Sequence, residues 1–264
     1  MQLKPMKQIT RTFAGIILGT LVTMASESLF AQGQPSGSQT ALRVGVAPNL
    51  PPMIFKEGAK IVGVEADLAQ AVGRELGRSI KLVEMPWPDL LDSLEANKVD
   101  IIMSSMSITR ARQARVAFSE PYLRIGQMAL VRADQKFRFS PLGTSFSSQT
   151  VGVIKATTGD LLMQQEYPRA KRKYFDSGEE AAKALSKKRI DAYLSDSTMI
   201  WYLAGKYEAQ GLVAAPIIFS NETLAWAMRR SDAELVASVN KVLKGMNDSG
   251  ELKRVLMRWI PKFE

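Results

Sequence analysis

The sequence of 264 residues contains neither cysteine nor histidine. Without cysteine the chain can form no disulfide, and it offers no thiol for catalysis or for lipid attachment after export. Histidine is the commonest general base and metal ligand, so its absence leaves only carboxylates for those tasks. No helix-spaced acidic cluster suggests a carboxylate metal site. We therefore expect no metal and no cofactor, and we favour a protein that is not an enzyme.

Long apolar runs are absent too, apart from Phe13–Ala25. This run is shorter than the roughly 20 residues that cross a bilayer. Basic residues precede it, and a polar stretch ending in the small residue Ala31 follows it. This pattern is typical of a secretory signal. We expect residues 1–31 to be a cleaved signal peptide, and residues 32–40, rich in Gly, Ser, Pro and Gln, to be a flexible leader of a soluble periplasmic protein.

The formal charge of the chain is +9. A basic chain can bind nucleic acid, but such proteins gather their charge in one patch or stripe. Here the basic clusters are scattered and have no interleaved aromatic residues: 171–173, 187–189 and 229–230. We interpret them as a solvated surface and expect no nucleic-acid partner.

Short apolar strands alternate with helical patterns from residue 42 onward. The first half shows this order over 42–46, 66–76, 80–83, 87–96 and 99–103. The second half repeats it with strands at 150–154, 172–175 and 190–194. A β-α-β-α-β order predicts a parallel sheet covered by helices. We expect two α/β lobes that face a shared cleft, with residues 41–130 and 225–264 in the first lobe and 131–224 in the second.

Polar residues follow the strands of both halves, and in parallel sheets ligands bind beyond the carboxyl ends of the strands. After the apolar run Val99–Met103 come Ser104, Ser105 and Ser107, and then Arg112 at helical spacing. Hydroxyls and one guanidinium suit a small anion, and a carboxylate fits the fork of arginine. The alternative is a capped helix with a solvated basic face.

Several motifs in this order resemble one family. They are Gly63–Leu68, Val99–Ile102, Ser107–Thr109 with Arg112, and Phe118–Tyr122. The chain resembles the family 3 bacterial extracellular solute-binding proteins, the periplasmic amino-acid receptors of ABC importers, over residues 41–264. The resemblance implies an α/β type II periplasmic-binding-protein fold, in which two hinge crossings join two lobes around a central cleft. We place the crossings near Leu130–Arg132 and Leu224–Met228.

The resemblance also implies which residues bind the ligand. Arg112 matches the arginine that pairs with the ligand α-carboxylate, and Asp196 matches the acid that receives the α-ammonium. A zwitterion needs one cationic and one anionic contact, both shielded from water. Two alternatives remain open at this point. In the first, Arg112 is only a charge on a helix face. In the second, Asp196 only caps the helix that begins near Ser197.

Four further positions match pocket residues that carry hydroxyl or backbone groups. Ser105 and Ser107 match the positions beside the arginine. Thr158 and Gly159 match the turn at a helix N-terminus, where backbone N–H groups favour an anion.

Two apolar positions bear on the side chain of the ligand. Trp87 matches a wall position, although a tryptophan between two prolines could also belong to the core. Leu50 stands where the family commonly has an aromatic residue, and Ala47 where receptors for cationic side chains have an acid. We therefore expect a neutral side chain.

The resemblance implies a monomeric receptor whose lobes close on an amino acid and which then docks on a membrane ABC permease. One alternative is an enzyme on the same scaffold, similar to cyclohexadienyl or arogenate dehydratases, with Asp160 or a carboxylate near it as the general acid. The other is a receptor that engages a signalling partner.

Overall fold

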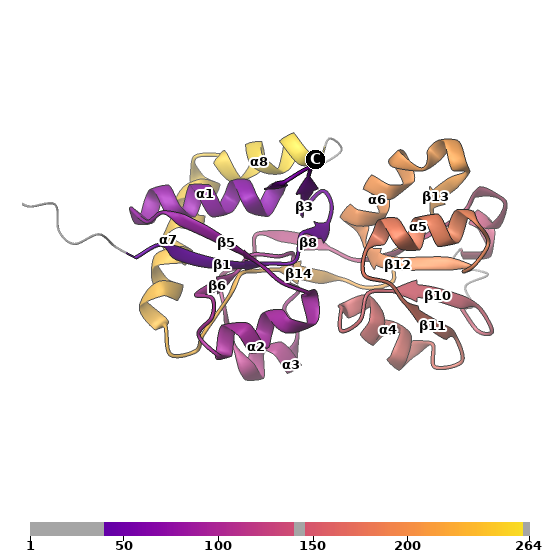
Figure 1. The fold of residues 1–264 in the computed structure, drawn as a ribbon, viewed down its shortest axis with the longest axis horizontal. Helices are drawn as coiled ribbons and strands as arrows, with labels where there is room; N and C mark the ends of the chain where they lie inside the picture. The colour runs from indigo at the N-terminus through magenta and orange to yellow at the C-terminus, as the bar shows by residue number, and fades with distance from the viewer. Residues whose placement is uncertain (1–39, 140–145, 261–264) are drawn as a thin grey trace, which may run out of the picture. The chain divides into compact units, whose positions relative to one another are not determined.

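The computed structural model describes residues 40–139 and 146–260 (Figure 1). The predicted signal peptide, and all of the predicted leader except Thr40, lie outside the described residues. Over the described ranges no helix is both long and apolar enough to cross a membrane.

The first sheet has the strand order β5-β1-β6-β15-β7. Its strands are β1 (Leu42–Val46), β5 (Ile80–Glu84), β6 (Ile101–Ile102), β7 (Ala117–Phe118) and β15 (Ala227–Met228). The strand β1 pairs in parallel with β5 and β6, whereas β15 is antiparallel to β6 and β7. Figure 1 shows helices on both faces. They are α1 (Val64–Leu76), α2 (Leu90–Glu95), α3 (Arg110–Arg115), α7 (Ala233–Asp248) and α8 (Glu251–Trp259).

The second sheet has the order β11-β10-β12-β9-β13. Its strands are β9 (Gln127–Arg132), β10 (Thr150–Val153), β11 (Lys171–Tyr174), β12 (Ala192–Asp196) and β13 (Leu212–Ala214). The helices α5 and α6 lie on one face and α4 on the other (Figure 1). Their bounds are α4 (Thr158–Glu166), α5 (Gly178–Ser186) and α6 (Ser197–Lys206). The parallel core strands predicted for each half are therefore present.

Short elements complete the fold. A small antiparallel sheet of β2 (Asn49–Leu50), β3 (Ile54–Glu57) and β4 (Lys60–Val62) follows β1. The described residues also form three 3-10 helices, η1 (Trp87–Asp89), η2 (Ala133–Phe139) and η3 (Glu208–Gln210).

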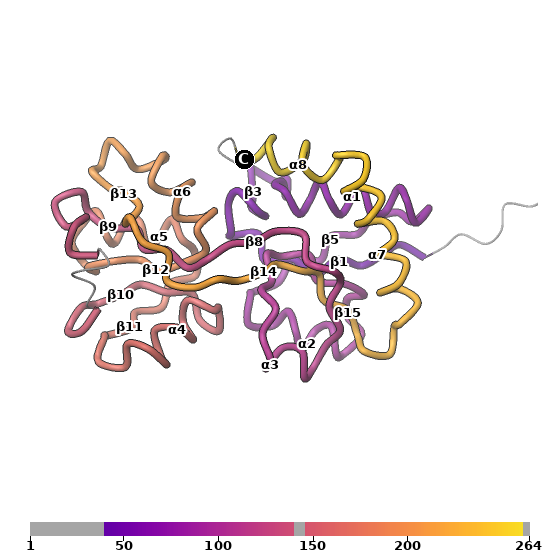
Figure 2. Tube along the Cα trace, turned by 180° about the vertical axis from the view of Figure 1, so that it is seen from behind, coloured from indigo at the N-terminus to yellow at the C-terminus, as the bar shows by residue number. Residues whose placement is uncertain are grey.

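Two strands connect the sheets. The chain leaves the first sheet through β8 (Leu123–Ile125) and returns through β14 (Glu222–Leu224). They pair antiparallel and run side by side (Figure 2). The crossing predicted at Leu130–Arg132 is wrong, because β9 pairs with β12 and β13 inside the second sheet. The predicted lobe boundary at 130/131 thus falls within a strand, because β9 belongs to the second sheet from Gln127 onward.

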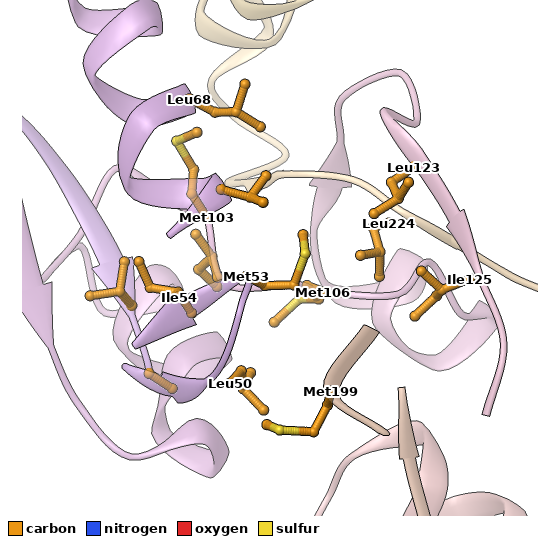
Figure 3. Packing of buried hydrophobic residues seen from close by; sticks show 14 of the residues in the cluster. Leu50, Met53, Ile54, Leu68, Met103, Met106, Leu123, Ile125, Met199 and Leu224 are labelled. Carbon is orange, nitrogen blue, oxygen red and sulfur yellow. The ribbon is translucent and has the colours of Figure 1, made fainter. Parts of the chain in front are cut away.

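Apolar side chains fix the loop that follows β6. Met103 and Met106 are buried at 0% and 1% exposure. Figure 3 shows Met53, Leu68, Met103 and Met106 gathered in one cluster, with Leu123 and Leu224 of the crossing strands nearby. The loop is therefore held by its methionines, which leaves the hydroxyls between them free to face elsewhere.

The helix α1 begins against the loop at Pro52–Met53. Its first residues donate to that loop, from Val64 N to Pro52 O at 3.2 Å and from Glu65 N to Met53 O at 2.8 Å. The preceding Gly63 has φ +119°, and a Cβ placed there would lie 2.6 Å from Met53 O. Only glycine adopts this backbone without strain and allows so close an approach.

We expect Gly63→Ala to lower the free energy of unfolding by about 1–3 kcal/mol or more, because it combines backbone strain with overlap. Urea denaturation measures this. The matched control is Gly205→Ala in α6, where a Cβ meets nothing within 4 Å. That change should leave stability unchanged or raise it by up to about 1 kcal/mol. Equal effects of the two changes would contradict the prediction.

Candidate functional site

A small cavity of about 10 Å³ lies where strands of both sheets end. The residues that line it are Leu50, Trp87, Ser105, Ser107, Arg112, Thr157, Thr158, Ser195 and Asp196. Every ligand position predicted from the sequence is among them except Gly159. That glycine is packed behind the wall, where a Cβ would lie 2.7 Å from Gln127 Oε1. The structure therefore brings together residues that are more than 140 positions apart in the chain.

Arg112 is fixed on α3, whose N-cap Thr109 accepts a hydrogen bond from Arg112 N at 3.2 Å. The side chain is buried, with 7% of the residue exposed. It donates to Ser107 O at 2.8 Å and to Ala156 O at 3.3 Å. Its guanidinium carbon lies 5.3 Å from the ring centroid of Trp87, a cation–π distance. Arg112 is thus a wall of the cavity and not a solvated charge on a helix face.

Burial lowers the pKa of Arg112 from its ordinary value, while the charges of Asp196 and Glu222 oppose that shift. Arginine stays protonated at any physiological pH. The cavity therefore holds a permanent, poorly hydrated positive charge.

Asp196 lies at the junction of β12 and α6. It occupies the N-cap position of α6, but its carboxylate makes no capping bond. Instead it accepts from Gln127 Nε2 at 2.7 Å and from Ser105 Oγ at 3.2 Å. Asp196 therefore faces the cavity and does not serve only as a helix cap.

The environment raises the pKa of Asp196 to about 6. Burial is the main cause, and repulsion by Glu222 adds to it. The hydrogen bonds from Gln127 and Ser105, and the charge of Arg112, pull the pKa in the other direction.

Gln127 and Glu222 bond to lining residues and were not predicted, and neither was the lining residue Ser195. Gln127 on β9 donates to both Asp196 and Thr158 Oγ1, the latter at 3.0 Å. Glu222 on β14 accepts from Ser107 Oγ at 2.5 Å and from Ser220 Oγ at 2.6 Å. The sequence could have indicated Gln127, because it is a polar residue at the edge of an apolar run. No sequence pattern indicates Glu222, since it lies in a polar connection.

The turn before α4 is held by residues of its own. Thr157 caps the helix by accepting from Asp160 N at 3.3 Å. Asp160 in turn accepts from Ala156 N at 3.1 Å and from Arg172 Nη1 at 2.8 Å. Asp160 does not line the cavity. The carboxylate considered as a general acid is therefore occupied in holding the turn and in an ion pair.

Trp87 and Leu50 both line the cavity, each with 7% of the residue exposed. Trp87 Nε1 donates to Ala156 O at 3.3 Å, the carbonyl that also accepts from Arg112. Trp87 also borders a larger cleft of about 670 Å³, whose charged lining residues are Glu84, Lys155 and Asp176. Over the part of the chain that the structure describes, no group of three or more acidic residues is placed to hold a metal.

Comparison with known proteins gives consistent matches. The pattern of the bacterial extracellular solute-binding proteins, family 3, matches residues 42–262. The chain is 27% identical over 230 residues to the arginine-binding extracellular protein ArtP of Bacillus subtilis (strain 168), which covers 86% of this chain and 88% of that protein.

Solved structures agree with this match. A mutant of ArgBP from T. maritima superposes with a TM-score of 0.78 at 34% identity, covering 84% of this chain and 96% of that one. An ancestral amino acid-binding protein, AncCDT-1, a precursor of cyclohexadienyl dehydratase, gives a TM-score of 0.75 at 32% identity, with 84% and 95% covered. The type II periplasmic-binding-protein fold with two α/β lobes, predicted from the sequence, is confirmed.

The raised pKa of Asp196 predicts how stability depends on pH. Its folded pKa, about 6, exceeds the ordinary 3.8, so the folded protein binds this proton more tightly than the unfolded chain. The free energy of unfolding therefore falls as pH rises from about 4 to 6, by up to roughly 3 kcal/mol. We expect Asp196→Asn to be more stable than wild type at pH 7 and similar to it near pH 4.

Urea unfolding followed by circular dichroism at both pH values measures this difference. The control is Asp89→Asn, an exposed aspartate at the start of α2 that makes no capping bond. It should leave the pH dependence unchanged. If Asp196→Asn and wild type differ in free energy of unfolding by the same amount at both pH values, the carboxylate does not titrate as expected.

Proposed function

The chain belongs to the bacterial extracellular solute-binding proteins, family 3, and on that basis we propose that it captures an amino acid between two closing lobes and delivers it to an ABC importer. One observation carries this proposal. Arg112, from the side of the first sheet, and Asp196, from the side of the second, line one cavity. Opposite charges that line one cavity suit a zwitterion.

The ligand α-carboxylate pairs with the Arg112 guanidinium, whose planar fork matches two oxygens. The backbone N–H of Thr158, at the N-terminus of α4, adds a donor for the same carboxylate. The α-ammonium binds the Asp196 carboxylate beside the Ser105 hydroxyl. The ligand thereby touches residues of both halves at once.

The ligand drives closure only through contacts that the closed form provides. Arg112 donates to Ala156 O and Asp196 accepts from Ser105, so the two halves touch through the residues of the site. A bound zwitterion offers each of these charges an oppositely charged partner in place of a neutral one.

Members of this family act outside the cytoplasmic membrane, and ArtP is an extracellular protein. The proposed periplasmic receptor is exported through the signal peptide expected at residues 1–31, acts as a monomer and docks transiently on a membrane permease.

The proposed ligand has a neutral side chain. Ala47 is buried at 1% exposure and brings no charge, and the apolar residues Leu50 and Trp87 line the cavity. Asp196 is the acidic residue among the lining residues, and the ligand ammonium occupies it. In the neighbouring cleft, Glu84 already pairs with Lys56 at 2.6 Å.

A dehydratase-like enzyme is the second candidate, because AncCDT-1, an amino acid-binding protein, is a precursor of cyclohexadienyl dehydratase. Such an enzyme needs a placed general acid. Asp160, considered for that role, bonds to Arg172 and Ala156 N and does not line the cavity. This favours the receptor.

We expect Arg112→Ala to weaken amino-acid binding at least about 30-fold, because a buried charge partner of the carboxylate is lost. Isothermal titration calorimetry measures the dissociation constant. The matched control is Arg110→Ala, an exposed arginine on the same helix. Its affinity should equal that of wild type. Unchanged binding by Arg112→Ala would remove Arg112 from the site.

A panel of amino acids tests the ligand class. We expect a neutral amino acid to bind with a dissociation constant well below millimolar, and arginine, lysine and histidine to bind more weakly, because Asp196, the acidic residue among the lining residues, is taken by the ligand ammonium. Tightest binding of arginine would contradict the neutral preference while leaving the receptor intact. Conversion of prephenate or arogenate by the purified protein would instead favour the enzyme.

A further inference from the structure

Glu65 is a buried carboxylate outside the cavity, in the first turn of α1, with 1% of the residue exposed. It accepts from the backbone N–H of Ser105 at 2.6 Å and from the Tyr122 hydroxyl at 2.6 Å through one oxygen. Its other oxygen accepts from Trp226 Nε1 at 2.9 Å. We propose that Glu65 is a positioning residue that holds Ser105 in the site and ties it to both crossing strands.

The first step of the argument concerns Ser105. Its φ is +57°, a left-handed conformation that residues other than glycine seldom adopt. Such a conformation persists when surrounding contacts fix it. The bond from Ser105 N to Glu65 is such a contact, and the serine hydroxyl reaches Asp196 Oδ2 at 3.2 Å. Glu65 therefore acts on the site through Ser105.

The second step concerns the crossing strands. Tyr122 directly precedes β8, and Trp226 follows shortly after β14. Their rings stack with centroids 5.4 Å apart, and Tyr122 N donates to Leu224 O at 3.0 Å. One carboxylate thus joins three segments: the loop of the site, the strand that leaves the first sheet and the strand that returns to it.

The third step concerns cost. Burying a carboxylate costs free energy, and the three groups that donate to Glu65 are neutral. A protein in which apolar residues replace buried charges is often no less stable than the original. Stability alone therefore gives no reason for a carboxylate here, whereas three converging donors require an acceptor with several lone pairs.

The proposal rests on the proposed function, and Glu65→Gln tests it. A carboxamide has similar size but only one acceptor oxygen, so one of the three donors must face its NH₂ group. We expect the affinity for the best amino acid of the panel to fall about tenfold. In a Ser105→Gly background the added effect should shrink to less than about twofold, because glycine accepts φ +57° without help.

The matched control is Asp67→Asn, the same chemical change in the same turn of α1. Asp67 accepts from Arg258 Nη1 and Trp259 Nε1, both at 2.9 Å, and not from the loop of the site. Its amino-acid affinity should stay at the wild-type value. A tenfold loss in Glu65→Gln that persists in the Ser105→Gly background, or no loss at all, would overturn the proposal.

Spectra of the ligand-free proteins separate this proposal from the proposed function. In ¹H–¹⁵N correlation spectra, Glu65→Gln should shift the Ser105 amide and the Trp226 indole N–H together, and Asp67→Asn should shift the Trp259 indole instead. A shift of neither Ser105 nor Trp226 contradicts the role of Glu65, whatever the ligand. Failure of wild type to bind any amino acid, with these shifts present, contradicts only the receptor.

Discussion

The site of this protein is built around two buried, opposite charges. They share one cavity without neutralising each other. Arg112 donates to two backbone carbonyls, and Asp196 accepts from an amide and a hydroxyl. Each charge is oriented by neutral groups, so each stays available to a ligand. This arrangement disfavours the ionised form of Asp196, because burial and the neighbouring Glu222 raise its pKa.

The fold delivers these charges because parallel strands end at the same edge of a sheet. Two such edges meet here, and the loop after β6 joins them to the crossing strands. Ile108 N donates to Thr223 O at 2.9 Å and Ala225 N to Met106 O at 3.1 Å, so the loop is bonded directly to the returning strand. A displacement at the crossings therefore reaches the residues that line the cavity, with Glu65 at the point where the segments meet.

Sequence patterns predicted a residue's role well where that role depends on near neighbours in the chain. The glycine-ended helix α1, the apolar strands and the hydroxyls before Arg112 all follow local rules. Sequence patterns predicted it less well where partners are distant. The crossing was misplaced because β8 pairs with β14 about 100 residues away, and Asp160 looked like a candidate acid because its partner Arg172 lies on another element.

The sequence by itself determined the α/β class, the family and the residues that carry the two charges, since these depend on periodicity and on motifs in order. Only the tertiary structure decided which of them share a cavity, that Gln127 and Glu222 stand beside it, and that Glu65 lies beneath Ser105. The physical reason is that burial and hydrogen bonding between remote segments arise when sheets and crossing strands pack, and neither leaves a periodic trace in the chain.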